Sequence, residues 1–383
     1  MALYSHDAQG LGHVRRNLAI AHSLSTLDPA PDVLLLTGAP EAVTAHRPTG
    51  CDLVSLPALA KDADGDYGAR HLSGLEHVVD MRRAVLTAAL SSFQPDVLVV
   101  DKHPRGLRGE LEPALRALED TPTKVVLGLR DVLDAPEVAR REWQKDRSPA
   151  ALARWYDEIW VYGDASVTDP LADLDLPVRL RERTIHTGYL AHGRETATSG
   201  RRTDVDTPYV LAMVGGGSDG AALAETFAAA PLPDGHTGVL VTGPQMPAAE
   251  RLRVRRIAAQ RTGMAVHDYV EDAPALLARA SAVVGMGGYN TVCEAMAAGT
   301  PMLVVPRVSP RTEQLVRARA LTRAGAVDHL TPDRLSTGAI TSWAEGAVTR
   351  PHSRATCVDL DGLSRLPQLL TALVSRTENA HVA

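Results

Sequence analysis

The sequence predicts an α/β protein made of two domains, each built around a mainly parallel sheet. Short apolar runs alternate with amphipathic helical stretches, as in chains of strand–helix–strand units. A glycine-rich turn follows the first strand of each half, and a polar stretch at 191–207 separates the two sets of strands. A chain of 383 residues is long enough for two such domains. We therefore expect an N-terminal domain at 1–190, a linker at 191–207, a second domain at 208–350, and a closing helix and tail at 351–383, with a cleft between the two domains.

The expected elements follow from runs of buried-type residues and from helical spacing. In the first half we expect strands at 2–5, 33–36, 97–100, 125–129 and 159–161, with helices at 14–25 and around 78–89. In the second half we expect strands at 209–214, 238–241, 265–267, 282–285 and 302–305, a helix at 221–230, and a closing helix at 363–373.

Composition excludes several classes of protein. The net charge is −6 and aromatic residues make up 4% of the chain, so a nucleic-acid binder is not expected. The three cysteines are scattered and lack metal-ligand spacing, which favours a reducing, cytoplasmic location. The first residues do not resemble a signal peptide, and no apolar run is long enough to span a bilayer. Peripheral contact with a membrane is the most that we expect.

The first glycine-rich turn contains Gly10 and Gly12 and directly follows the first strand. A dinucleotide-binding turn would have a third glycine at position 15, which is Arg15. It would also have an acidic residue at the end of the second strand, where Thr37 stands. Both departures argue against a dinucleotide cofactor.

The second glycine-rich turn runs from residue 215 to 220 and opens the helix expected at 221–230. Successive glycines permit close approach of a ligand, and a helix start offers unpaired N–H groups, so a pyrophosphate would fit. In the alternative interpretation, Ser218 or Asp219 only caps the helix.

A third motif combines a glycine turn, a helix that carries Glu294, and a glycine stop before the next strand. A carboxylate in a small, apolar helix is costly unless it is exposed or paired, and a ribose diol is a suitable partner. The alternative is an exposed helical glutamate.

With these motifs the chain resembles GT-B glycosyltransferases. It is most similar to family 28, the family of the enzyme that adds N-acetylglucosamine to a lipid-linked muramyl peptide. The resemblance is specific mainly over 209–325, residues 10–17 match the acceptor-side glycine loop, and residues 129–134 are similar to a group of predicted bacterial glycosyltransferases. The resemblance implies two Rossmann-like domains that face each other across a cleft.

The resemblance also implies roles for individual residues. For the donor, it assigns Gly216, Gly217 and Ser218 to the diphosphate, the backbone of Val270 to the base, Gly287, Gly288 and Thr291 to the phosphate and ribose region, Glu294 to the ribose, and Glu313 and Gln314 to the sugar, with Arg311 near the phosphates.

Candidate acceptor-side residues come from the first half. His13 is the candidate general base, because a neutral imidazole suits that task. Asp101 and His103 follow the strand at 97–100, where strand ends line the clefts of α/β sheets. Gly10, Gly12, Arg15 and Arg130 are candidate acceptor-binding residues, although solvated arginines are the default, and Arg130 and Asp131 are alternatively a structural ion pair.

The expected function is transfer of a sugar from a nucleotide diphosphate sugar, with UDP or dTDP favoured, to a small-molecule or lipid-linked acceptor. Retaining relatives carry a glutamate eight residues before the ribose carboxylate, whereas that position here is Met286, which favours inversion. The helix start at Ser218 would stabilise the leaving diphosphate, so neither a metal nor a cofactor is expected. Two alternatives remain: a nucleotide-sugar hydrolase or epimerase of the same fold, and a non-catalytic nucleotide-binding subunit.

Overall fold

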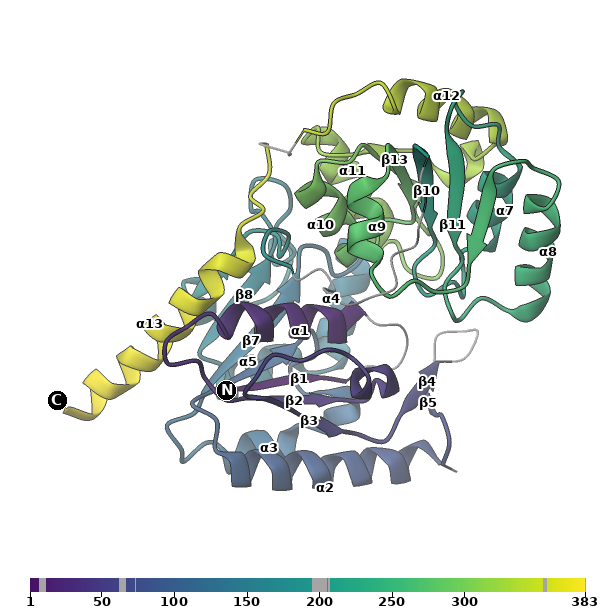
Figure 1. The fold of residues 1–383 in the computed structure, drawn as a ribbon. Helices are drawn as coiled ribbons and strands as arrows, with labels where there is room; N and C mark the ends of the chain where they lie inside the picture. The colour runs from purple at the N-terminus through teal and green to yellow at the C-terminus, as the bar shows by residue number, and fades with distance from the viewer. Residues whose placement is uncertain are drawn as a thin grey trace. The chain divides into compact units, whose positions relative to one another are not determined.

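The computed structural model describes residues 1–6, 12–61, 67–72, 74–194, 205, 207–353 and 357–382, with backbone alone at 61 and 377–382. The chain divides into two compact units (Figure 1). Unit 1 comprises Met1–Arg194 and Asp361–Ala383, and unit 2 comprises Glu195–Leu360. Most of the predicted linker at 191–207 lies outside the described residues.

Unit 1 is organised around a parallel sheet of seven strands in the order β3-β2-β1-β6-β7-β8-β9. Its strands are β1 (Ala2–Ser5), β2 (Val33–Thr37), β3 (Cys51–Ser55), β6 (Val97–Asp101), β7 (Lys124–Arg130), β8 (Glu158–Tyr162) and β9 (Thr184–His186). A separate antiparallel pair joins β4 (Leu59–Lys61) to β5 (Tyr67–Ala69). Its helices are α1 (Gly12–Leu24), η1 (Pro40–Val43), α2 (Leu75–Phe93), η2 (Leu107–Gly109), α3 (Glu112–Ala117), α4 (Pro136–Lys145), α5 (Ser148–Trp155), α6 (Val178–Arg181) and α13 (Gly362–Val382).

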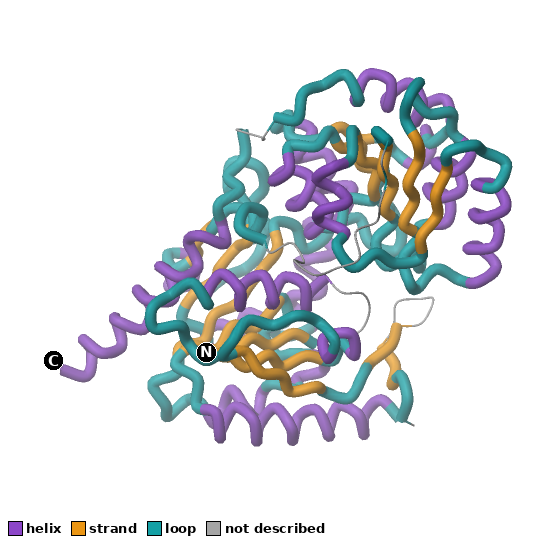
Figure 2. The backbone as a smooth tube through the Cα atoms, viewed as in Figure 1, coloured by secondary structure: helices purple, strands orange, loops and turns teal. Residues whose placement is uncertain are grey.

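The inner strands of unit 1 are buried on both faces because helices cover both sides of the sheet (Figure 2). Ala2 and Tyr4 of β1 share one buried cluster with Leu86 and Leu90 of α2. Helices α2 and α3 pack together, as do α1 and α13 (Figure 1). The apolar runs of the sequence therefore correspond to a sheet between two helical layers.

Helix α13 lies far along the chain but completes unit 1. Its side chains Leu363, Leu366, Leu370 and Leu373 recur at helical spacing and are all buried. The Ser23 hydroxyl of α1 donates a hydrogen bond to the carbonyl of Leu363 at 2.5 Å. The C-terminal segment is thus part of the core of unit 1.

Unit 2 contains a parallel sheet of six strands in the order β12-β11-β10-β13-β14-β15. Its strands are β10 (Tyr209–Met213), β11 (Thr237–Val241), β12 (Met264–His267), β13 (Ala282–Gly285), β14 (Met302–Val304) and β15 (Asp328–His329). Its helices are α7 (Ala221–Ala229), α8 (Ala248–Ala258), α9 (Ala273–Arg279), α10 (Tyr289–Ala298), α11 (Glu313–Arg323), η3 (Pro332–Arg334) and α12 (Thr337–Ala347). In Figure 1, α7 and α8 lie on one side of this sheet, and α9, α10 and α11 lie on the other.

The predicted α/β class and the predicted strands are confirmed, with bounds that differ by at most two residues. The prediction did not include β3, β9 or β15, all of which lie at edges of the sheets. These edge strands are short or half-exposed, so they lack the continuous apolar run that marks a buried strand. The prediction also missed the hairpin of β4 and β5, whose strands have three residues each and likewise lack a long apolar run.

Candidate active site

In unit 1, the strand order reverses between β1 and β6, which are neighbours in the sheet but far apart in sequence. In open α/β sheets, ligands bind beside the carboxyl ends of the strands at such a reversal. Helix α1 begins at Gly12, just after β1, and Asp101 is the last residue of β6. The topology therefore brings His13 and Asp101 to the same edge of the sheet.

His13, Asp101 and Arg16 form one cluster at this edge. The Nδ1 atom of His13 lies 2.9 Å from Asp101 Oδ2. Arg16 Nη2 donates to the same Asp101 oxygen and lies 3.0 Å from His13 Nδ1. We assign the imidazole proton to Nδ1, because it then faces the carboxylate that both neighbours share. This tautomer leaves the lone pair of the imidazole on Nε2.

Asp101 is kept ionised by its surroundings. Burial by itself would raise the pKa of Asp101, but the charge of Arg16 and the contact with His13 outweigh it and hold the pKa well below its usual range. The next residue, Lys102, has a φ of 70°, a left-handed conformation that is costly for a residue with a side chain. Strain of this kind concentrates at functional sites.

His6 is a member of this cluster that sequence reasoning missed. It follows β1 directly, is 4% exposed, and packs edge-to-face against His13 and His103 with ring centroids 5.3 and 4.6 Å away. Its Nε2 lies 3.1 Å from the hydroxyl of Tyr67 on β5. Burial, followed by the charges of His103, His13 and Lys102, lowers the pKa of His6 well below its ordinary value. His6 is therefore a neutral imidazole beside His13.

A buried ion pair between Arg82 and Glu110 holds the backbone of His6. Arg82 of α2 donates to both carboxylate oxygens of Glu110, at 2.5 Å from Nε and 2.8 Å from Nη2. Arg82 Nη2 also donates to the carbonyl of His6 at 2.8 Å, and the Tyr4 hydroxyl donates to Glu110. Both members of the pair are fully buried, so the end of β1 is fixed by a network that water does not screen.

The other residues predicted for unit 1 are distributed around the same sheet edge. His103 joins the cluster through His6, and its Nδ1 lies 4.0 Å from Asp146. Gly12 and Arg15 lie in the first turn of α1, Arg130 ends β7, and Gly10 lies outside the described residues.

The residue next to Arg130 has a structural role. Asp131 is fully buried, accepts a hydrogen bond from the Tyr189 hydroxyl at 3.1 Å, and accepts another from the Val132 N–H at 2.9 Å. These contacts bind the end of β7 to the segment after β9.

Unit 2 has its own reversal of strand order, between β10 and β13. The glycine turn follows β10 at this point. A Cβ at Gly217, which has a φ of 95°, would lie 2.2 Å from the carbonyl oxygen of Thr242. The Gln245 N–H also donates to the Gly216 carbonyl at 2.8 Å. Two backbone segments therefore meet so closely that only glycine fits at position 217.

Capping does not account for the glycine turn. The N-cap of α7 is Gly220, and no side chain accepts a hydrogen bond there. The capping interpretation of Ser218 and Asp219 is therefore wrong. A turn of small residues that leads to a helix start without a side-chain cap is suited to an anion.

The second opening of unit 2 lies after the neighbouring strand, β13. Gly287 has a φ of 80°, and Gly288 is the N-cap of α10, again without a side-chain hydrogen bond. Thr291 is half-buried in the first turn of α10, and Glu294 lies one turn further on. Glu294 is 5% exposed, so the interpretation as an exposed helical glutamate is wrong.

A cluster around Arg307 follows β14, and sequence reasoning did not single out this arginine. Its Nη1 lies 2.8 Å from Asp219 Oδ2 in the glycine turn, and its Nη2 lies 3.2 Å from Glu313 Oε1. Its backbone N–H donates to Gln314 Oε1 at 2.9 Å. The predicted pair Glu313 and Gln314 therefore lies beside the predicted diphosphate turn, and Arg311 lies half-buried in the loop between them and Arg307.

Val270 lies after β12 and is buried, with the exposed Tyr269 before it. Asp272 accepts a hydrogen bond from the Ala275 N–H at 3.0 Å and so caps α9. Strands β12, β10, β13 and β14 run parallel, so these loops all lie at the carboxyl edge of one sheet. The predicted donor residues are thus collected on one edge of unit 2.

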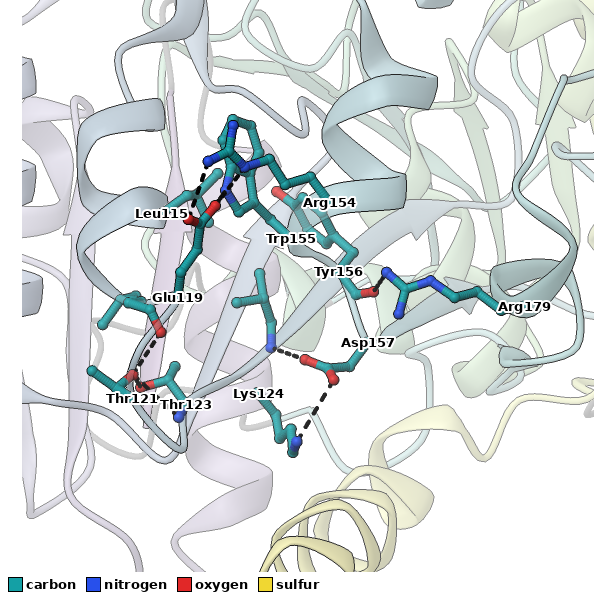
Figure 3. A pocket seen from close by; sticks show the side chains of 12 residues that line it. Leu115, Glu119, Thr121, Thr123, Lys124, Arg154, Trp155, Tyr156, Asp157 and Arg179 are labelled. Carbon is teal, nitrogen blue, oxygen red and sulfur yellow. Dashed lines mark hydrogen bonds and ion pairs between the residues drawn. The ribbon is translucent and has the colours of Figure 1, made fainter.

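A hollow of unit 1 with a volume of about 210 Å³ lies at the opposite edge of its sheet (Figure 3). Glu119 there contacts Arg154 at 2.6 Å, and Asp157 lies 3.7 Å from Lys124. Because these charges already pair with one another, we assign no binding role to this hollow.

In the described part of the chain, no three His, Cys, Asp or Glu side chains gather in a way that would hold a metal ion. Within the same residues, no helix combines the length and the apolar character needed to cross a bilayer.

Comparison with known proteins agrees with this architecture. Residues 211–342 match the glycosyltransferase family 28 C-terminal domain. A relative from Solidesulfovibrio magneticus, UDP-N-acetylglucosamine–N-acetylmuramyl-(pentapeptide) pyrophosphoryl-undecaprenol N-acetylglucosamine transferase, is 25% identical over 339 residues, which span 85% of this chain and 83% of the relative.

Two solved structures share the whole fold. The glycosyltransferase VinC in complex with dTDP is 16% identical, with a TM-score of 0.62 and coverage of 99% of this chain and 100% of VinC. MurG of Acinetobacter baumannii is 15% identical, with a TM-score of 0.56 and coverage of 98% and 99%. Together, these similarities support a glycosyltransferase with the GT-B fold that is similar to family 28.

Proposed function

We propose that the protein transfers a sugar, with inversion and without a metal, from a UDP or dTDP donor to a nucleophile on a small-molecule or lipid-linked acceptor. The observation that carries this proposal is the contact of His13 with Asp101 at the strand-order reversal of unit 1. A histidine oriented by a buried carboxylate is an arrangement well suited to general-base catalysis.

In the proposed reaction, the acceptor hydroxyl gives its proton to His13 Nε2 while its oxygen attacks the anomeric carbon of the donor. The bond from that carbon to the β-phosphate oxygen breaks, and the nucleoside diphosphate leaves with the electron pair. Asp101 stabilises the imidazolium that forms, and Arg16 fixes Asp101 in place. His103, Gly10, Gly12, Arg15 and Arg130 are proposed to surround the acceptor.

On the donor side, we propose that the glycine turn at Gly216, Gly217 and Ser218 and the start of α10 bind the diphosphate. Two helix starts with glycine at the N-cap, both beside one strand-order reversal, support this assignment. They also supply the charge stabilisation that a metal would otherwise provide. Further donor contacts are proposed for Val270, Gly287, Gly288, Thr291, Glu294, Arg311, Glu313 and Gln314.

The class of acceptor is proposed from the relatives. The relative from Solidesulfovibrio magneticus acts on a pyrophosphoryl-undecaprenol, which supports a lipid-linked acceptor. The VinC structure contains dTDP, which supports a nucleoside diphosphate in unit 2. We propose a cytoplasmic protein that makes at most peripheral contact with a membrane.

Calorimetric titration with UDP, dTDP, GDP and ADP tests the donor assignment. We expect UDP or dTDP to bind, and Glu294→Ala to weaken binding about tenfold or more through loss of the ribose contact. Glu345→Ala, which changes an exposed glutamate of α12, is the matched control and is expected to bind normally. A folded wild-type protein that binds none of the four nucleotides would contradict the donor site.

Acceptor screening with the identified donor then tests the reaction. Product with an inverted anomeric configuration, unchanged by a chelator, is the expected result. Release of free sugar without an acceptor would instead indicate a hydrolase. Tight binding without turnover of any acceptor would indicate a non-catalytic nucleotide-binding subunit.

A further inference from the structure

Arg307 connects two parts of unit 2 that are far apart in sequence. Its guanidinium bridges two carboxylates, with Nη1 2.8 Å from Asp219 and Nη2 3.2 Å from Glu313. Its backbone N–H holds the side-chain carbonyl of Gln314 at 2.9 Å. A single residue after β14 therefore contacts both the glycine turn and the start of α11.

The position of Asp219 gives this connection a consequence for donor binding. It stands directly after Ser218, in the turn proposed to receive a diphosphate. A carboxylate at that place repels an incoming anion, because two like charges a few ångströms apart oppose binding even in a partly solvated site. Unless a cation compensates it, Asp219 would weaken the donor site that contains it.

The contacts of Arg307 supply that compensation. Its Nη1 donates to Asp219, and the same group reaches Glu313, so each carboxylate is paired in the absence of a donor. The side chains of Arg307 and Asp219 are 24% and 36% exposed. Ion pairs with this much exposure contribute little to folding. Stability alone therefore does not explain this arrangement.

We propose that Arg307 is a positioning residue for the donor. It neutralises Asp219, so that the glycine turn accepts a diphosphate, and it fixes Glu313 and Gln314 beside that turn for contact with the sugar. This inference rests on the proposed function, since it assumes that the turn binds the diphosphate of the donor.

The test is calorimetric titration of UDP and dTDP into the wild-type protein, Arg307→Ala, Asp219→Asn and the double variant. We expect Arg307→Ala to weaken binding roughly ten- to a hundredfold, because the carboxylate of Asp219 is then uncompensated. Asp219→Asn alone is expected to bind at least as tightly as the wild type. In the double variant, binding is expected to return to within a few-fold of the wild type.

The matched control is Arg253→Ala, which removes an arginine that lies 2.9 Å from Glu225, between α8 and α7. It is expected to bind normally. Binding by Arg307→Ala within twofold of the wild type, or no recovery in the double variant, would overturn the inference. If Arg307→Ala does not fold, weaker binding by Asp219→Asn would overturn it instead.

The same titrations separate this inference from the proposed function. If the wild type binds a nucleotide and the Arg307 variants do not differ from it, only the role of Arg307 fails. If the folded wild type binds no nucleotide, the donor site fails and the role of Arg307 fails with it.

Discussion

Replacement of Asp101 by asparagine tests the catalytic cluster most directly. Asp101 Oδ2 faces both His13 Nδ1 and Arg16 Nη2, and the side chain is 2% exposed. Asparagine preserves the shape but has only one oxygen acceptor. Because Oδ2 faces both neighbours, an asparagine oxygen in that place can still accept from His13 and Arg16, and the amide nitrogen then takes the place of Oδ1. The side chain is now neutral, so the imidazolium that forms when Nε2 takes the acceptor's proton loses the negative charge that stabilises it.

The expected loss follows from this lost charge. An asparagine in place of the carboxylate that orients a catalytic histidine lowers kcat by about 10⁴-fold in serine proteases, where the tautomer changes as well. We expect a smaller fall of about 10²- to 10³-fold for Asp101→Asn, which corresponds to about 3 to 4 kcal/mol of barrier. The KM for the donor is expected to change little, because the proposed donor residues belong to unit 2.

The same substitution also costs stability. Arg16 is 1% exposed and would lose the negative charge that compensates it. Breaking a buried ion pair typically costs about 3 to 5 kcal/mol of folding free energy. We expect a smaller loss for Asp101→Asn, because the amide oxygen of asparagine still accepts a hydrogen bond from Arg16. Since whole domains are stable by about 5 to 15 kcal/mol, the variant is expected to fold, with a lower melting temperature.

The assay is steady-state transfer with the identified donor and acceptor, at a temperature where circular dichroism shows the variant to be folded. Asp157→Asn, at the opposite edge of the same sheet, is the matched control, and full activity is expected. A folded Asp101→Asn variant with kcat within tenfold of the wild type would refute the role assigned to His13 and Asp101.

Three further predictions concern stability. Gly217→Ala is expected to lower the melting temperature and to abolish measurable nucleotide binding, because its Cβ would lie 2.2 Å from the Thr242 carbonyl oxygen; normal calorimetry and melting would contradict this. Arg82→Ala is expected to cost about 3 to 5 kcal/mol in urea denaturation, since it leaves the buried Glu110 unpaired, and a loss below about 1 kcal/mol would argue against the network. The pKa of His6 is lower in the folded than in the unfolded protein, so the free energy of unfolding should fall by up to about 1.4 kcal/mol per pH unit as the pH drops below 6.5. In urea denaturation at several pH values, His6→Phe should flatten that slope. An unchanged slope would contradict the role of His6.

The sequence was sufficient to predict the buried strands, because their apolar runs are continuous. It did not reveal the edge strand β3, in which the alternation of Cys51–Ser55 gives no such run. Edge strands have one hydrogen-bonded neighbour and partial exposure, so their residues are less constrained to be apolar.

The sequence located most candidate site residues but not their partners. His6 stood one position after a predicted strand, and that position alone indicated a place at the sheet edge. Its contacts with His103 and with Tyr67 depend on loops that are distant in sequence. Arg307 was missed for the same reason, since its connection to Asp219 spans 88 positions of the chain. Local sequence patterns do not specify such contacts, because they form only when the folded sheet brings loops from distant parts of the chain to the same edge.

The return of α13 to unit 1 has a consequence for biosynthesis. The chain leaves unit 1 at Arg194 and comes back at Asp361, so every residue of unit 2 is translated before α13. The buried leucines Leu363, Leu366, Leu370 and Leu373 show that unit 1 needs this helix to complete its core. On the ribosome, unit 2 therefore has its full sequence available first, and unit 1 stays open until α13 emerges. Folding of the two units is thus expected to finish in the reverse of the order in which their first residues are made.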